Sequence, residues 1–254
     1  MKLYIGNKTY SSWSMRPWVL MRALAIDFDE VWVPFDGFTP DAEFKKTMAA
    51  IHPLATVPVL EAEDVIIADS LAIIEYLAEA YPEKQVWPQN AQDRNIARQL
   101  TAIMHSGFQA IRGHCPMNIG AELPDVGARL MKDHPALKAE LDLLEAILKP
   151  QFKDQDFLFG EFSAVDAFYA PVMSRIKTYN LTVSAEMASY QKRVLSHPAV
   201  ADWCKKALAE NIFLDFEEPY RQNINGNDGQ AITPNLHPKP SFGNDSKCRR
   251  LQCL

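Results

Sequence analysis

Cysteine is scarce in this sequence, and the four cysteines are scattered, with none in the first 114 residues. The spacing of Cys115, Cys204, Cys248 and Cys253 does not match a metal site. Proteins of oxidising compartments that depend on disulfides carry more cysteine than this. We therefore expect a reducing, cytoplasmic setting and no bound metal.

Long apolar runs and clusters of positive charge are missing as well. No apolar run approaches the ~18 residues that suggest a membrane span, and the opening MKLYIG turns polar too soon for a signal peptide. The net charge is −6, and no basic run precedes residue 247. We therefore expect neither a membrane anchor nor a nucleic-acid partner.

The chain does have ample apolar sequence, since 48% of its 254 residues are hydrophobic. In residues 1–81 the pattern alternates between strand-like and helix-like segments. We predict strands at 2–6, 30–35, 57–60 and 65–68, and helices at 15–26, 40–50 and 69–80. This β-α-β-α-β-β-α order predicts a small mixed sheet with helices on its faces.

Residues 82–92 form a connector with prolines at both ends, and no strand pattern follows it. Spacings of three and four residues predict helices at 93–112, 125–148, 163–179, 186–195 and 199–209. Residues 93–222 therefore read as an all-α domain, in which Ser163 and Asp166 form a capping box. The composition changes at residue 223 to Asn, Gly and Pro, which predicts a flexible tail over 223–254.

Two features near the end of the first domain suggest a site for a short acidic peptide. Pro58 lies in an apolar strand, where proline marks an edge, a bulge or a cis bond, and it leaves the backbone of Val57 free to pair with an extended peptide. Asp69 and Ser70 open the predicted helix 69–80. Free N–H groups and the helix dipole at such a position favour a carboxylate.

Three serines, Ser11, Ser12 and Ser14, lie at the start of the first predicted helix, where Pro17 is tolerated. A hydroxyl beside a positive helix terminus stabilises a thiolate. Lowering a thiol pKa from ~8.5 by two units takes about 2.7 kcal/mol. The simpler alternative is that a serine caps the helix. We favour capping for Ser14, whereas Ser11 lies further out in the loop and is the better candidate for an anion contact.

As a set, these motifs resemble the cytosolic glutathione transferases, with the bacterial and zeta-like serine-type members most similar. The set comprises SSWSMR at 11–16, TVP at 56–58, Asp69-Ser70 and the Ser163–Asp166 box, and it covers roughly residues 1–220. The resemblance implies a thioredoxin-like N-terminal domain, an all-α domain, a homodimer and glutathione as co-substrate.

The resemblance assigns the thiol to the serine loop. Ser11 would hydrogen-bond the glutathione sulfur, with Ser12 as its nearest substitute. Tyr10 adjoins Ser11 and is an alternative sulfur partner. Zeta enzymes have a cysteine after the paired serines, whereas this chain has Trp13, which weakens the expectation of maleylacetoacetate isomerase activity.

The rest of glutathione would lie along the peptide site. The resemblance implies that Pro58 is cis and that the Val57 backbone pairs with the cysteinyl part. Ser70 would take the carboxylate of the γ-glutamyl end, and Asp69 would help to hold its ammonium group.

The second substrate would bind on the helical domain. His105, Gln109 and Arg112 fall at i, i+4 and i+7 on the predicted helix 93–112. Such a polar stripe is usually a solvated or interface surface; the functional alternative is that His105 and Arg112 bind the second substrate, Arg112 through a carboxylate.

These features predict a glutathione transferase that acts in detoxification on a hydrophobic or unsaturated electrophile. A glutathione-dependent isomerase or peroxidase, or a non-catalytic interaction module, remains as an alternative.

Overall fold

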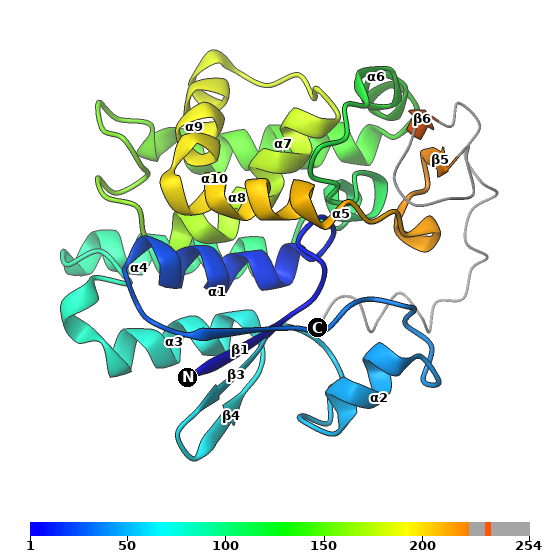
Figure 1. Ribbon diagram of the computed structural model, residues 1–254. Helices are drawn as coiled ribbons and strands as arrows, with labels where there is room; N and C mark the ends of the chain where they lie inside the picture. The colour runs from blue at the N-terminus through cyan, green and yellow to red at the C-terminus, as the bar shows by residue number, and fades with distance from the viewer. Residues whose placement is uncertain (224–231, 235–254) are drawn as a thin grey trace. The chain divides into compact units, whose positions relative to one another are not determined.

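The computed structural model describes residues 1–223 and 232–234, and the side chains of residues 1–221. The chain divides into one compact unit, Met1–Glu210, and a second that begins at Asn211. The first unit contains the sheet and the long helices (Figure 1). Within the described residues, no helix is both long enough and apolar enough to cross a membrane.

A four-stranded mixed sheet lies near the N-terminus of the first unit. Its strands are β1 (Lys2–Ile5), β2 (Asp29–Trp32), β3 (Val59–Ala62) and β4 (Val65–Ile67), in the spatial order β2-β1-β3-β4. β1 runs parallel to β2 and antiparallel to β3, and β3 pairs antiparallel with β4. The predicted element order β-α-β-α-β-β-α and the predicted mixed sheet of a thioredoxin-like domain are confirmed.

Three helices accompany the sheet: α1 (Ser12–Ala23), α2 (Glu43–Ala49) and α3 (Ser70–Ala80). α1 is buried from Ser14 to Met21, because it packs against α3 and also against two helices of the following part, α8 and α10. A helix that is enclosed on most sides has no single apolar stripe. α1 is therefore the element through which the sheet and the helical part share one core.

The helical part begins after a short 3-10 turn, η1 (Pro82–Lys84), and contains a second such turn, η2 (Lys149–Gln151). Its helices are α4 (Ala91–Ser106), α5 (Gln109–His114), α6 (Pro124–Asp133), α7 (Pro135–Leu148), α8 (Ala164–Thr178), α9 (Ala185–Ser196) and α10 (Pro198–Glu210). α8 packs against α1, α4 and α9 and is buried along almost its whole length. The predicted capping box at its start is present, with the Ser163 amide 3.0 Å from Asp166 Oδ2.

Two predicted helices are each divided in the structure. The prediction of one helix over 93–112 is wrong, because Gly107 ends α4 and Phe108 adopts a left-handed φ of 61° before α5. The prediction of one helix over 125–148 is also wrong, because Pro135 has no N–H for a continuing helix and opens α7 instead.

The second unit contains a 3-10 turn, η3 (Asp215–Glu217), and two short antiparallel strands, β5 (Arg221–Asn223) and β6 (Ile232–Pro234). The expectation that no strand follows the connector is therefore wrong. The predicted flexible tail, 223–254, lies outside the described residues except at Asn223 and 232–234. The domain limits at residues 81, 92 and 222 stay predictions.

Candidate functional site

The loop between β1 and α1 brings Ser11 to the N-terminus of α1. The loop turns tightly, with the amides of Tyr10 and Ser11 donating to the Asn7 carbonyl at 3.1 and 2.8 Å. Ser11 occupies the N-cap position but makes no capping hydrogen bond with its side chain. Its Oγ instead donates to Ser14 Oγ at 2.7 Å, and Ser14 Oγ also accepts the Gly6 amide at 3.3 Å. The Ser11 hydroxyl thus lies at a positive helix end without serving as its cap.

The interpretation of Ser14 as the helix cap is wrong. α1 begins at Ser12, which makes Ser14 the third helical residue, and Ser14 is fully buried. Its hydroxyl accepts from the Gly6 amide and is hydrogen-bonded to Ser11. A hydroxyl can donate one hydrogen bond and accept two, so Ser14 is able to act as a donor to Ser11 as well.

Ser12 faces the helical part of the unit. Its Oγ accepts from Arg175 Nη2 at 3.2 Å, and Arg175 Nε donates to the Cys115 carbonyl at 2.8 Å. Tyr10, the alternative sulfur partner, is as deeply buried as Ser11. Burial therefore does not distinguish Tyr10 from Ser11, whereas Ser12 is already engaged by an arginine.

The predicted peptide edge has the expected backbone geometry. The Val57–Pro58 bond is cis, which confirms the prediction for Pro58. β3 begins at Val59, which pairs with Tyr4, so Val57 lies just outside the ladder rather than in it. Val57 is half-buried at this edge.

Asp69 joins the start of α3 to the end of α4. Its Oδ1 caps α3 by accepting the amides of Leu71 and Ala72 at 2.8 and 3.3 Å, and its Oδ2 lies 3.2 Å from Nε2 of His105. The hydrogen bond with His105 outweighs the effect of burial and lowers the pKa of Asp69 to about 2. The site therefore holds an ionised carboxylate at neutral pH. His105, which we predicted to contact the second substrate, lies beside this carboxylate, and its contact with a substrate stays a prediction.

Ser70, next to Asp69, is completely buried. Its hydroxyl has no hydrogen-bond partner in the described part of the chain. An unmade hydrogen bond of this kind costs about 1–3 kcal/mol. A ligand carboxylate could satisfy this hydroxyl only after the side chains that cover Ser70 move.

Arg112 closes the break between α4 and α5. Its Nη2 donates to the carbonyls of Met104 and His105, the latter at 2.9 Å. Gln109 Nε2 donates to the Ser106 carbonyl at 3.2 Å. Since the helix is divided here, the predicted polar stripe is not one helical face, although Arg112 and His105 remain neighbours.

Two guanidinium groups lie over the Trp13 ring. The Arg16 group is 4.2 Å and the Arg112 group 4.9 Å from the ring centre, and His105 meets the ring edge-on at 5.3 Å between centroids. Cations over a tryptophan face are stabilised by the ring quadrupole. The guanidinium groups of Arg16 and Arg112 therefore place positive charge at Trp13, close to Asp69.

Arg16 is the most deeply buried of these cations. It is 2% exposed, and its Nε and Nη1 have no hydrogen-bond partner within the described residues. Burial, followed by the charges of Arg112 and Arg175, lowers the pKa of Arg16, and Asp69 is the acid that opposes the effect. Sequence reasoning missed Arg16 and Arg175 as site residues. The site therefore has an excess of buried positive charge, which an anion would offset.

The arrangement can recognise a small molecule with charges of both signs. Asp69 suits an ammonium group, the arginines around Trp13 suit a carboxylate, and the Ser11 hydroxyl suits an anion at the start of α1. No group of three or more possible metal ligands occurs within the described residues.

Comparisons with known proteins place this site in a family context. The profile "Glutathione S-transferase, N-terminal domain" matches residues 10–80, and the profile "Glutathione S-transferase, C-terminal domain" matches residues 121–206. Glutathione S-transferase 1 of Dianthus caryophyllus is 32% identical over 149 residues, which are 59% of this chain and 65% of that protein. The match thus spans slightly less than two thirds of this relative.

Two further proteins are similar over more of their length. Maleylacetoacetate isomerase of Rattus norvegicus is 26% identical over 72% of this chain and 81% of that protein. The crystal structure of a glutathione transferase homologue from Burkholderia, with bound glutathione, superposes with a TM-score of 0.63 at 22% identity, covering 82% of this chain and 98% of the other. The profiles match both the sheet part and the helical part, and the chain belongs to the glutathione S-transferase family.

Proposed function

We propose that this chain is an enzyme that binds glutathione, holds its thiol as a thiolate at Ser11, and adds that thiolate to a small, unsaturated electrophile bearing a carboxylate. The observation that carries the proposal is the Ser11 hydroxyl, which lies at the N-terminus of α1 without capping it. The structural relative from Burkholderia was crystallised with glutathione, which supports the same co-substrate here.

In the proposed complex, Asp69 binds the γ-glutamyl ammonium group and the Val57 backbone pairs with the cysteinyl residue. The Ser70 hydroxyl donates to the γ-glutamyl carboxylate after the side chains that cover Ser70 move. Because its pKa is low, the Asp69 carboxylate stays ionised throughout the neutral range and can pair with the ammonium group.

The thiol would be activated by a reversal of one hydrogen bond. Ser11 now donates to Ser14. When Ser14 donates to Ser11 instead, the Ser11 proton is free for the sulfur, and the Gly6 amide still binds Ser14. The thiol proton leaves to solvent, and the negative charge on sulfur faces the positive end of α1.

The thiolate then attacks the electrophilic carbon. A C–S bond forms. In an addition, the electron pair of the carbon–carbon double bond moves to the conjugated carbonyl oxygen, and the resulting enolate takes a proton from solvent at its α-carbon. In a substitution, the bond to the leaving group breaks and its electron pair departs with that group. The cations around Trp13 favour an electrophile that carries a carboxylate, with Arg112 as its proposed partner and His105 beside it.

Glutathione-dependent isomerisation is the second candidate, and the rat relative carries the name of such an enzyme. An isomerase would add and then release the thiolate, so glutathione would not be consumed. Trp13 occupies the position at which zeta enzymes have cysteine, and this favours transfer over isomerisation. Counting free thiols during turnover separates the two: transfer consumes one thiol per product, and isomerisation consumes none.

Thermal melting with glutathione tests the proposal as a whole. A ligand that binds only the folded state raises Tm. We expect glutathione to raise Tm, cysteinylglycine, which lacks the γ-glutamyl part, to raise it much less, and a panel of unsaturated acids to include substrates. An unchanged Tm at millimolar glutathione would rule out the proposed co-substrate.

Replacing Ser70 by alanine should separate binding from stability. The free protein loses only an unpartnered hydroxyl, so its Tm should stay the same or rise. The affinity for glutathione should fall by about 1–3 kcal/mol, roughly 5- to 150-fold, because a hydrogen bond to the carboxylate is lost. Calorimetric titration measures this affinity, and an unchanged Kd would remove Ser70 from the site.

Replacing Arg112 by glutamine should impair the use of acidic electrophiles alone. We expect KM for an unsaturated acid to rise about tenfold, the loss of one charge-assisted contact in a partly solvated site. The methyl ester of the same acid serves as the control, because its KM should not change. Equal changes for the acid and the ester would assign Arg112 to the support of α4 rather than to substrate recognition.

We also propose a homodimer that acts in detoxification in the cytoplasm, as the family resemblance implies. Sedimentation equilibrium should give twice the mass of the chain, and a monomer at micromolar concentration would contradict this part of the proposal.

A further inference from the structure

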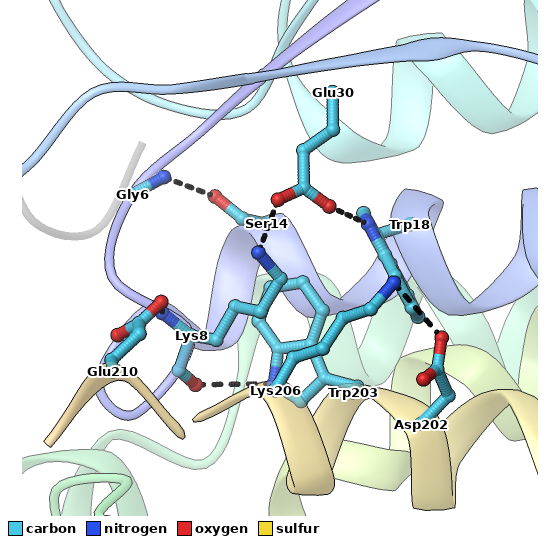
Figure 2. A network of polar contacts seen from close by, with 9 residues as sticks. All are labelled: Gly6, Lys8, Ser14, Trp18, Glu30, Asp202, Trp203, Lys206 and Glu210. Atoms are coloured by element: carbon cyan, nitrogen blue, oxygen red, sulfur yellow. Dashed lines mark hydrogen bonds and ion pairs between the residues drawn. The ribbon is translucent and has the colours of Figure 1, made fainter. Parts of the chain in front are cut away.

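α10 holds the loop between β1 and α1 through both backbone groups of one residue (Figure 2). Glu210 Oε1 accepts the Lys8 amide at 2.8 Å, and Trp203 Nε1 donates to the Lys8 carbonyl at 3.1 Å. One turn of α10 further along from Trp203, the Ala207 carbonyl accepts Thr9 Oγ1 at 3.1 Å. The three helical residues fall at i, i+4 and i+7, on one face of α10.

The side chain of Lys8 fixes the same loop to the sheet and to α1. Its ammonium group forms an ion pair with Glu30 of β2, and the other oxygen of Glu30 accepts Trp18 Nε1 at 2.7 Å (Figure 2). The ammonium group also lies 5.6 Å from the centre of the Trp203 ring. Lys8 is therefore a buried junction between α10, β2 and α1.

Glu210 is poorly placed for the stability of its own helix. It is the last residue of α10, where a carboxylate meets the negative end of the helix dipole. Burial raises its pKa, an effect that the Lys8 amide and ammonium oppose, and its Oε2 has no hydrogen-bond partner in the described part of the chain. The hydrogen bond to the Lys8 amide therefore explains why a carboxylate occupies position 210, whereas the stability of α10 does not explain it.

The loop transmits the position of Lys8 to Ser11 over a short distance. Lys8 lies three residues before Ser11, in a turn closed by the hydrogen bond of 2.8 Å from the Ser11 amide to the Asn7 carbonyl. Donors to a reacting anion act within tolerances of about 0.5 Å. A small shift of Lys8 would therefore misplace the Ser11 hydroxyl.

We infer that Glu210 is a positioning residue for Ser11: by holding the Lys8 amide, it sets where the Ser11 hydroxyl meets the thiol. The inference rests on the proposed role of Ser11 at the glutathione sulfur. In this arrangement the helical part both binds the electrophile and, through α10, influences the pKa of the bound thiol.

The test compares Glu210→Ala with Glu210→Gln in the full chain. The alanine variant should raise the pKa of the bound thiol by about half a unit or more and lower kcat about fivefold, with KM for glutathione unchanged. The glutamine variant keeps an oxygen for the Lys8 amide and should recover most of both losses. Asp202→Asn is the matched control, because Asp202 pairs with Lys206 at 3.1 Å on the same helix and should affect neither quantity.

The outcomes separate this inference from the proposed function. If Ser11→Ala raises the thiol pKa and Glu210→Ala does not, the positioning role is wrong and the role of Ser11 stands. If Ser11→Ala leaves the thiol pKa unchanged, both are wrong. Should Glu210→Ala fail to fold, Glu210→Asp withdraws the carboxylate from the Lys8 amide by one methylene group, and an unchanged thiol pKa in that variant overturns the inference.

Discussion

Replacing Ser11 by alanine should lower kcat/KM for glutathione transfer by about 10- to 100-fold. The loss of one preorganised donor to a developing oxyanion costs about 2.7–4 kcal/mol, and a thiolate, which is already fairly stable in water, should lose less. The affinity for glutathione should change little, because the proposed contacts of Asp69 and Ser70 with the γ-glutamyl end lie away from the sulfur. Steady-state kinetics with one unsaturated acid, together with calorimetry of glutathione binding, measures both quantities.

Ser14→Ala and Tyr10→Phe are the controls for this prediction. The Ser11 hydroxyl donates to Ser14 Oγ at 2.7 Å, and Ser14→Ala removes this partner. The loss of kcat/KM in Ser14→Ala should therefore be smaller than that in Ser11→Ala but not zero. Tyr10→Phe should leave kcat/KM unchanged. A large loss in Tyr10→Phe, with Ser11→Ala like the wild type, would transfer the sulfur contact to the tyrosine.

Replacing Asp69 by asparagine should weaken glutathione binding about 10- to 100-fold. A hydrogen bond between charged groups contributes about 1.5–3 kcal/mol, and the variant removes the charge that the ammonium group needs. Asparagine caps helices about as well as aspartate, so α3 should keep its first turn. The loss of the carboxylate that His105 stabilises should nevertheless lower the Tm of the free protein modestly. Calorimetry and thermal melting of the same sample separate these two effects.

Asp69→Ala shows what the loss of the cap adds. This variant should bind glutathione as poorly as Asp69→Asn and should also lose about 1 kcal/mol of stability, because Leu71 and Ala72 lose the acceptor for their amides. Wild-type affinity in Asp69→Asn would show that the carboxylate acts only through His105 and α3.

The sequence predicted most elements because their signals are local. The succession of strands and helices along residues 1–81 follows from apolar alternation and turn residues, and the start of α8 follows from its capping box. Two helix breaks were missed for different reasons. Pro135 and Gly107 are visible signals that we did not use, whereas the left-handed conformation of Phe108 has no marker in the sequence, because a phenylalanine rarely adopts it.

In the candidate site, too, residues with local sequence signals were predicted and residues joined by long-range contacts were missed. Pro58 and Asp69 were predictable because proline chemistry and helix capping act within a few residues. The arginine beside Ser12 comes from 163 positions away, and the carboxylate that holds Lys8 comes from 202 positions away. Contacts at such separations depend on how α8 and α10 pack on α1, and a single sequence has no periodic signal for that packing.

Ultraviolet titration of the thiolate in the glutathione complex tests the central claim most directly. The account predicts that the bound thiol of the wild type titrates at least one unit below the ~8.5 of a free thiol. Ser11→Ala should return the pKa most of the way to that value, and Tyr10→Phe should match the wild type. A wild-type complex that titrates like free glutathione, or one whose pKa responds to Tyr10→Phe and not to Ser11→Ala, would contradict the assignment of the thiolate to Ser11.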